Sequence, residues 1–240
     1  MQIAYVGSTV GHSHEEITRR ETIANSLVDA DVTYLRPNLG PKSVESRCEA
    51  AFSARLIAQL IDENASEFDG FLVGCFGEPG LVAARELVDK PVIGSASSAF
   101  HIAAQLGDTA ACITVLDSVV PLIRERVSAA GLEDVITDVR AIDVPIHDID
   151  HESQTLVESM VTAGKKVVDE CGVDVIVPGC MSLSFAQQNA TIAERVGIPV
   201  VDPVVTGLET TSLGVKHGLS GSKHAYPAVP SNKPLFGPDE

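Results

Sequence analysis

Short apolar runs alternate along the chain with longer stretches in which apolar residues recur every three or four positions. Runs of four to eight apolar residues are typical of buried strands, and the periodic stretches are typical of amphipathic helices. The pattern therefore predicts an α/β protein in which parallel strands alternate with helices. The predicted strands cover residues 3–7, 32–35, 71–74, 92–94, 111–115, 135–142, 173–177 and 200–202.

Two predicted helices have clear signals. The first has apolar residues four positions apart, and two isoleucines widen its stripe. That stripe consists of Val44, Cys48, Phe52, Leu56 and Leu60, with Ile57 and Ile61 beside it. The second helix is predicted over residues 118–127, with Asp117 or Ser118 as its N-cap and its end before Gly131. The proline-rich segment 218–240 predicts an extended tail laid over one domain.

One order of features occurs twice along the chain. Asp69 opens an apolar strand that ends in Gly-Cys at Cys75, and Asp174 opens another that ends in Gly-Cys at Cys180. Each strand is followed by a helical stretch, and a proline then opens a second short strand. The chain is therefore predicted to use one strand–helix–strand–helix unit twice, with a thiol at the same corner of each copy.

The repeat predicts two pseudo-symmetric doubly wound domains, each with a roughly four-stranded parallel sheet. A boundary near residues 95–97 and a return near 204–207 would divide the strands between them. The predicted first domain is residues 1–96 with 205–240, and the second is 97–204. Ligands bind beyond the C-terminal ends of parallel strands, where both repeated cysteines fall. We therefore expect an active site in the cleft between the domains.

Two thiols that face one carbon from opposite sides can remove a proton from one face and return it to the other. Cys75 and Cys180 each precede a predicted helix, whose free amides and dipole should favour the thiolate and lower the pKa. The other three cysteines are interpreted as structural: Cys48 on its apolar stripe, Cys112 within a strand and Cys171 at a helix end. Five unclustered cysteines favour neither a disulfide framework nor a zinc site.

The composition narrows the classes of partner. A net charge of −16 argues against nucleic acid and anionic membranes as partners. No apolar run approaches the roughly 20 residues of a membrane span, and the N-terminus resembles a first strand more than a signal peptide. Reduced thiols and a cytoplasmic location are therefore expected. The acidic surface fits either a cytoplasm of high salt or an ordinary acidic cytosolic protein.

Other constellations carry weaker predictions. The turn from Gly7 to Gly11 matches neither a P-loop nor a Gly-x-Gly-x-x-Gly motif, so no nucleotide site is predicted. The histidine-containing segments 12–15 and 147–151 are interpreted as polar loop and cap residues, so no metal is expected. His101 lies in an otherwise apolar helix and is predicted to be a satisfied interior or pocket-lining residue. No Gly-x-Ser-x-Gly nucleophile elbow is present.

Distinctive segments surround the two repeated cysteines and extend over most of the chain. They are residues 40–46, Gly74-Cys-Phe-Gly-Glu-Pro-Gly-Leu81, 84–86, 91–94, 113–117, 120–123, Gly179-Cys-Met181, 218–220 and 223–227. Together these segments resemble the hydantoin racemases of the aspartate/glutamate/hydantoin racemase superfamily, to which the allantoin racemases are close. The family usually carries Asn-Pro-Asn after the first strand and Ala-Gly-Met after the second cysteine. This chain has Gly7-Ser-Thr9 and Met181-Ser-Leu183 there, so the resemblance does not fix the substrate.

The resemblance implies cofactor-independent racemisation of 5-substituted hydantoins, with allantoin as a further candidate, by 1,1-proton transfer between Cys75 and Cys180. It implies that neutral side chains hold the ring amides and that apolar side chains form the walls. The implied substrate-binding residues are Ser8, Thr9, Pro41, Phe76, Gly77, Thr114, Met181 and Ser182. A small-molecule substrate and a homo-oligomer are expected, and neither a metal nor a cofactor.

Alternatives stay open within the superfamily: an amino-acid racemase, an arylmalonate-type decarboxylase or a maleate-type isomerase. The decarboxylase needs one cysteine, and amino-acid racemisation needs carboxylate and ammonium recognition that the mostly neutral expected pocket lacks. A non-catalytic small-molecule binding protein on the same fold is the alternative from another class, and retention of both thiols argues against it.

Overall fold

The computed structural model describes residues 1–149 and 154–230. The interpretation of Asp150 and His151 as loop residues, and the end of the predicted tail, lie outside these described residues. Within the described ranges, no helix is long and apolar enough to cross a membrane.

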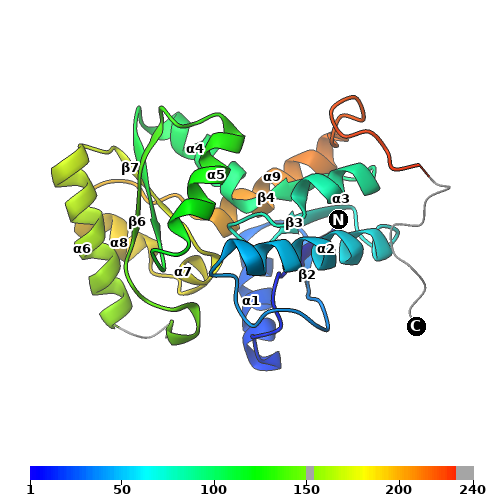
Figure 1. Ribbon diagram of the computed structural model, residues 1–240, viewed down its shortest axis with the longest axis horizontal. Helices are drawn as coiled ribbons and strands as arrows, with labels where there is room; N and C mark the ends of the chain where they lie inside the picture. Colours follow the sequence, from blue (N-terminus) through cyan, green and yellow to red (C-terminus); the bar gives the residue numbers. More distant parts are fainter. Residues whose placement is uncertain (150–153, 231–240) are drawn as a thin grey trace.

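The first sheet contains four parallel strands in the order β2-β1-β3-β4 (Figure 1). The strands are β1 (Gln2–Val6), β2 (Asp31–Leu35), β3 (Gly70–Val73) and β4 (Val92–Gly94). Helices α1 (His14–Leu27), α2 (Arg47–Glu63) and α3 (Leu81–Leu87) connect them. The central strand β3 is buried along its whole length, which explains why its sequence is apolar without alternation.

The second sheet contains three parallel strands in the order β6-β5-β7. Its strands are β5 (Ala110–Thr114), β6 (Ile136–Ala141) and β7 (Val175–Pro178). The predicted strand over residues 200–202 is wrong, because only Val200 forms an isolated parallel bridge, with Ile176. Pro203 opens the next helix with Asp202 as its N-cap, so the chain leaves the sheet after one bridge. That bridge still lies beside β7 as β4 lies beside β3, which repeats the order of the first sheet.

The remaining helices are α4 (Ser95–Leu106), α5 (Val120–Ala130), the 3₁₀ turn η1 (Ile146–Asp148), α6 (Gln154–Cys171), α7 (Met181–Phe185), α8 (Asn189–Val196) and α9 (Pro203–His217). The predicted side-chain cap of the helix near residue 118 is wrong, since the N-cap of α5 is Val119, without a side-chain hydrogen bond. A proline in the first turn of α5 removes one of the amides that a cap would satisfy.

Helices α4 and α9 each pack on the sheet that they do not directly follow from in the order of the repeat, α4 on the second sheet and α9 on the first. Helix α4 follows β4 in the chain but packs on β7 and α5, whereas α9 follows the second sheet but packs on β3, β4 and α1. The two helices also pack against each other, and Figure 1 shows α9 between the two sheets. These contacts are compatible with the predicted domain boundaries near residues 96 and 205, which remain a prediction.

Two sequence-based predictions of burial are wrong and one is confirmed. Cys48 and Phe52 are exposed on α2, whose buried face includes Ile57 and Ile61. An α-helix turns 100° per residue, so a strict four-residue spacing rotates about 40° per step and leaves the buried face. His101 is not interior but lines an outer pocket, which was the second of its two predicted placements, and its Nδ1 lies 2.7 Å from the Ser97 carbonyl. Cys112 is fully buried, as predicted.

Candidate active site

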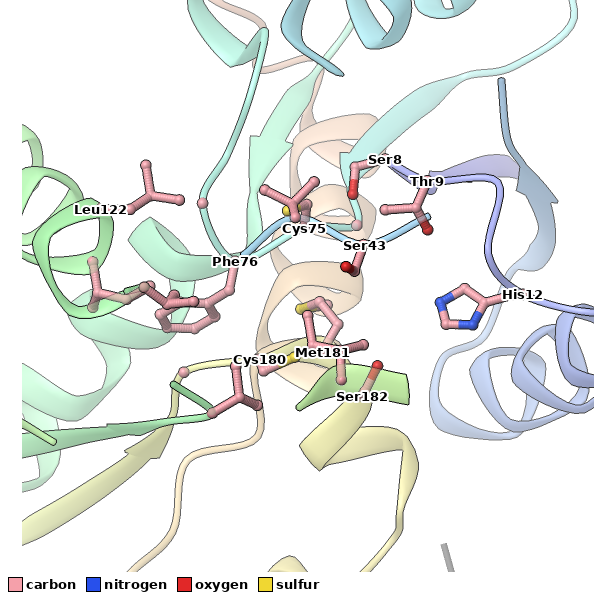
Figure 2. Close-up of a pocket in the computed structure, with 18 of the residues that line it drawn as sticks. Ser8, Thr9, His12, Ser43, Cys75, Phe76, Leu122, Cys180, Met181 and Ser182 are labelled. Carbon is pink, nitrogen blue, oxygen red and sulfur yellow. The ribbon is translucent and has the colours of Figure 1, made fainter. Parts of the chain in front are cut away.

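Cys75 and Cys180 line the same cavity (Figure 2). Each follows the C-terminal end of a strand that lies next to the first strand of its sheet: β3 for Cys75 and β7 for Cys180. The two cysteines therefore enter the cavity from two different sheets, at the edge where parallel sheets bind ligands.

The turn after Cys75 is held by hydrogen bonds to its backbone. The Cys75 carbonyl accepts from the Glu78 amide at 2.9 Å and from the Ser95 hydroxyl at 3.1 Å. Glu78 has a positive φ of 50°, and its buried carboxylate accepts from the amide and hydroxyl of Ser97 at 2.7 and 2.8 Å. Helix α3 begins only at Leu81, so the prediction that Cys75 directly precedes a helix is wrong.

The Cys180 corner packs closely on β5. The Gly179 amide donates to the Ile113 carbonyl at 2.7 Å, and the Thr114 hydroxyl donates to the Gly179 carbonyl at 3.1 Å. A Cβ at Gly179 would lie 2.7 Å from the sulfur of Cys112, so only glycine fits here. Thr114 is fully buried beneath this corner and is not among the residues that line the cavity, so its role in substrate binding remains a prediction.

The pKa values of both thiols differ from the sequence-based prediction. Burial raises the pKa of Cys75 to about 11, although hydrogen bonds from the Ser8 hydroxyl and the Gly77 amide act in the opposite direction. Burial also raises the pKa of Cys180, against hydrogen bonds from the backbone at Ser182. The predicted lowering is therefore wrong, because removal of water from the thiolates outweighs the local donors.

Six of the eight predicted substrate-binding residues line the cavity. They are Ser8, Thr9, Phe76, Gly77, Met181 and Ser182. The two exceptions are Thr114 and Pro41. Pro41 instead lines an outer groove with Leu39 and Phe52. The Pro41 carbonyl accepts from the Val10 amide at 3.0 Å, and the loop then turns Ser43 towards the cavity in its place.

The sequence-based prediction missed several lining residues, namely Arg20, Tyr34, Ser43 and Val44, and His12 was interpreted as a loop residue. Arg20 is the most informative of them, with only 3% of its surface exposed. Its place in the sequence carried a signal: Ile17, Arg20 and Ala24 follow the spacing of an apolar helix face. A cation at such a position indicates a buried charge with a partner.

Arg20 is held by contacts from both halves of the molecule. Its Nε donates to the Glu16 carboxylate at 2.6 Å, and its Nη2 donates to the Ser182 hydroxyl at 2.9 Å. The guanidinium carbon lies 4.8 Å from the centre of the Phe185 ring. Burial lowers the pKa of Arg20, but Tyr34, Tyr5 and Glu16 more than offset it, so this pKa lies above its ordinary value.

The cavity has one apolar side and one polar side. Figure 2 shows Phe76 and Leu122 on the side away from the hydroxyls of Ser8 and Thr9 and the ring of His12. Among the described residues, no group of three or more His, Cys, Asp or Glu side chains could hold a metal ion. The arrangement offers two thiols as acid and base, neutral donors for a polar ring, and an apolar surface.

Comparisons with known proteins agree with this geometry. The sequence model of the Asp/Glu/Hydantoin racemase family matches residues 15–211. The hydantoin racemase of Pseudomonas sp. (strain NS671) is 29% identical over 210 residues, which cover 87% of this chain and 84% of that protein.

Two solved structures are similar over nearly the full length. The allantoin racemase from Pseudomonas fluorescens is 28% identical with a TM-score of 0.90, covering 99% of this chain and 100% of that one. The allantoin racemase from Klebsiella pneumoniae is 26% identical with a TM-score of 0.88, covering 99% and 97%.

Proposed function

We propose, from the premise that this chain belongs to the Asp/Glu/Hydantoin racemase family, that it racemises a cyclic ureide. The chain is an isomerase of the racemase type. The proposed substrates are 5-substituted hydantoins, with allantoin as a further candidate, since relatives named for both are similar to it. The observation that carries the proposal is the pair of cysteines, Cys75 and Cys180, that line one cavity from the ends of two sheets.

The proposed reaction is a 1,1-proton transfer that needs no cofactor. One thiolate removes the hydrogen from the stereogenic carbon beside a carbonyl, and the electron pair moves into the enolate. The opposite thiol then donates its proton to the other face of that carbon, so one thiolate is present before and after. The raised pKa of both thiols makes the thiolate a minor species at neutral pH, but also a stronger base when it forms.

The cavity lining supports a polar ring with an apolar substituent. The hydroxyls of Ser8, Thr9 and Ser182 can pair with ring amides and carbonyls, and Phe76 and Leu122 can pack against the 5-substituent. A carbon flanked by a carbonyl and a ring nitrogen carries an already acidic hydrogen, which lowers the barrier that the thiols must overcome.

The presence of Arg20 in the lining gives a second candidate some support. The sequence-based prediction treated the pocket as mostly neutral, whereas a guanidinium and the imidazole of His12 line it. These groups could bind a carboxylate, so amino-acid racemisation is the second candidate function. A panel of enantiopure 5-substituted hydantoins, allantoin, aspartate and glutamate, followed by circular dichroism, separates the two candidates.

The thiol mechanism is tested with Cys75→Ser and Cys180→Ser. Each variant should lose racemisation by at least about 10²-fold, because a positioned acid or base typically contributes 10²–10⁴-fold. Exchange of the substrate hydrogen with deuterated solvent should survive on one enantiomer in each variant. Cys48→Ser, which changes an exposed thiol, is the matched control and should keep the wild-type rate. Wild-type racemisation by both cavity variants would rule the mechanism out.

A further inference from the structure

The two cavity thiols lie next to charges of opposite sign. We propose that Arg20 is a positioning residue that makes Cys180 the first of the two thiols to ionise, while the carboxylate of Glu78 disfavours the thiolate of Cys75. This inference rests on the proposed function, because it assigns the starting roles of base and acid in the same two-thiol reaction. It explains which of two similar cysteines ionises first and so serves as the base, while the other stays a thiol and serves as the acid.

Arg20 reaches Cys180 through one intermediate residue. Its Nη2 donates to the Ser182 hydroxyl, and the backbone and side chain of Ser182 hydrogen-bond in turn to the Cys180 sulfur. The positive charge of Arg20 also acts directly on Cys180, since it favours the thiolate there. Because Arg20 is buried, this attraction is screened by water much less than a surface pair would be.

Glu16 does not cancel the positive charge of this cluster. Its carboxylate pairs with Arg20 at 2.6 Å and also with Arg19 at 2.7 Å. Glu16 therefore shares its one negative charge between two guanidinium groups, of which Arg20 lines the cavity.

The surroundings of Cys75 have the opposite sign. Burial is the largest cause that disfavours its thiolate, and the negative charges of Cys180 and of the Glu78 carboxylate add to it, whereas the neutral donors Ser8 and Gly77 act in the opposite direction. Glu78 is only 6% exposed, and the hydrogen bonds from Ser97 favour its charged form. Burial raises the pKa of Glu78, against which Ser97 and the cations Arg126 and Arg85 act.

The other titratable groups that face the thiols do not provide this asymmetry. Tyr5 and Tyr34 lie on the first sheet, and burial raises the pKa of both, so their phenols stay neutral near neutral pH. Burial likewise raises the pKa of Cys112, which faces Cys180 from β5. His12 lines the cavity from the loop after β1, and its contribution is therefore tested directly.

The test measures the ionisation of each thiol without relying on turnover. The full-length protein is alkylated with iodoacetamide from pH 6 to 11, and the rate at each cysteine is read by peptide mass spectrometry. The midpoint of each pH profile reports thiolate formation, whereas access changes only the amplitude. In the wild type, Cys180 should have the lower midpoint, and the exposed Cys48 serves as an internal standard.

Three substitutions test the effect of the two charges on these midpoints, and His12→Gln is the comparison for the histidine in the lining. Arg20→Gln keeps a hydrogen-bond donor for Ser182 but removes the charge, so the Cys180 midpoint should rise by about one pH unit, a tenfold loss of thiolate. Arg20→Lys keeps the charge and should restore most of that loss. Glu78→Gln should lower the Cys75 midpoint, and this arm remains informative if Arg20→Gln does not fold.

Several results would overturn the proposal: a Cys180 midpoint that Arg20→Gln leaves unchanged, an equal shift at both thiols, or a shift that only His12→Gln produces. The proposed function fails separately. If the midpoints move as expected but no hydantoin is racemised, the charge asymmetry stands and the reaction is wrong. If racemisation is found without the midpoint shifts, the reaction stands and the role of Arg20 is wrong.

Discussion

Substitution of Gly179 by alanine tests how closely the structure fixes the second thiol. A methyl group at residue 179 would lie 2.7 Å from the Cys112 sulfur and 2.9 Å from the Thr114 Cβ, both on the fully buried strand β5. Ordinary carbon contacts are about 3.5–4.0 Å, so the corner that carries Cys180 must move by roughly 0.5–1 Å. Overpacking of this kind costs about 1–3 kcal/mol, and a 1 Å displacement of a reacting group can cost about 10²-fold in rate.

Urea unfolding followed by circular dichroism measures the first effect, and kcat/KM for racemisation measures the second. Gly172→Ala is the control, because residue 172 precedes β7, the strand that leads to Cys180, and a Cβ there would have no neighbour within 4 Å. Its left-handed φ of +65° should cost about 1 kcal/mol of stability without a change in kcat/KM. Adding Cys112→Ala to Gly179→Ala should recover part of both losses, since one of the two overlaps disappears. Wild-type stability and activity in Gly179→Ala alone would refute the packing argument.

Three further predictions follow from the site and its supports. Burial raises the pKa of both thiols, so the single thiolate that the reaction needs forms only as pH rises. We therefore expect kcat/KM to increase about tenfold per pH unit from pH 7 to 8, and a flat profile contradicts this. Ser95→Ala removes a donor to the Cys75 carbonyl and should lower both kcat and the free energy of unfolding, the latter by about 1 kcal/mol. An unchanged kcat would show that this bond does not position the thiol. Asp202→Ala removes the N-cap of α9, whose carboxylate accepts from the Val204 amide at 2.8 Å. The free energy of unfolding in urea should fall by about 1–2 kcal/mol, and an unchanged urea midpoint counts against a stabilising cap.

The repeat in the sequence predicted most of the fold, because each strand of the fold is marked by its own apolar run. Buried parallel strands require continuous apolar runs, and such runs are visible in one sequence without any partner. The exception at Val200 is also physical: two valines followed by Asp202 and a proline are enough for a bridge but not for a strand. The direction in which α2 faces was not predictable from its apolar stripe, since tertiary contacts chose the face with Ile57 and left Phe52 70% exposed.

The site was predicted where it depends on the strand ends and missed where it depends on packing between the halves. Cys75 and Cys180 follow from the position at which each strand stops, so the repeat alone located them. Arg20 enters the cavity from a helix that joins the first two strands, and its partner Ser182 lies 162 positions further along the chain. No local pattern encodes that distance. The homo-oligomeric state and the cytoplasmic location remain predictions.

The bond between Arg20 and Ser182 bears on how such a chain can evolve. A sequence assembled from two similar units suggests parts that could be exchanged one at a time between relatives. Here a buried cation from one unit donates to a hydroxyl from the other, and separating them would leave Arg20 with its Glu16 partner but without that hydroxyl. Recombination between relatives should therefore give more stable chimeras when both members of this pair are inherited from the same parent.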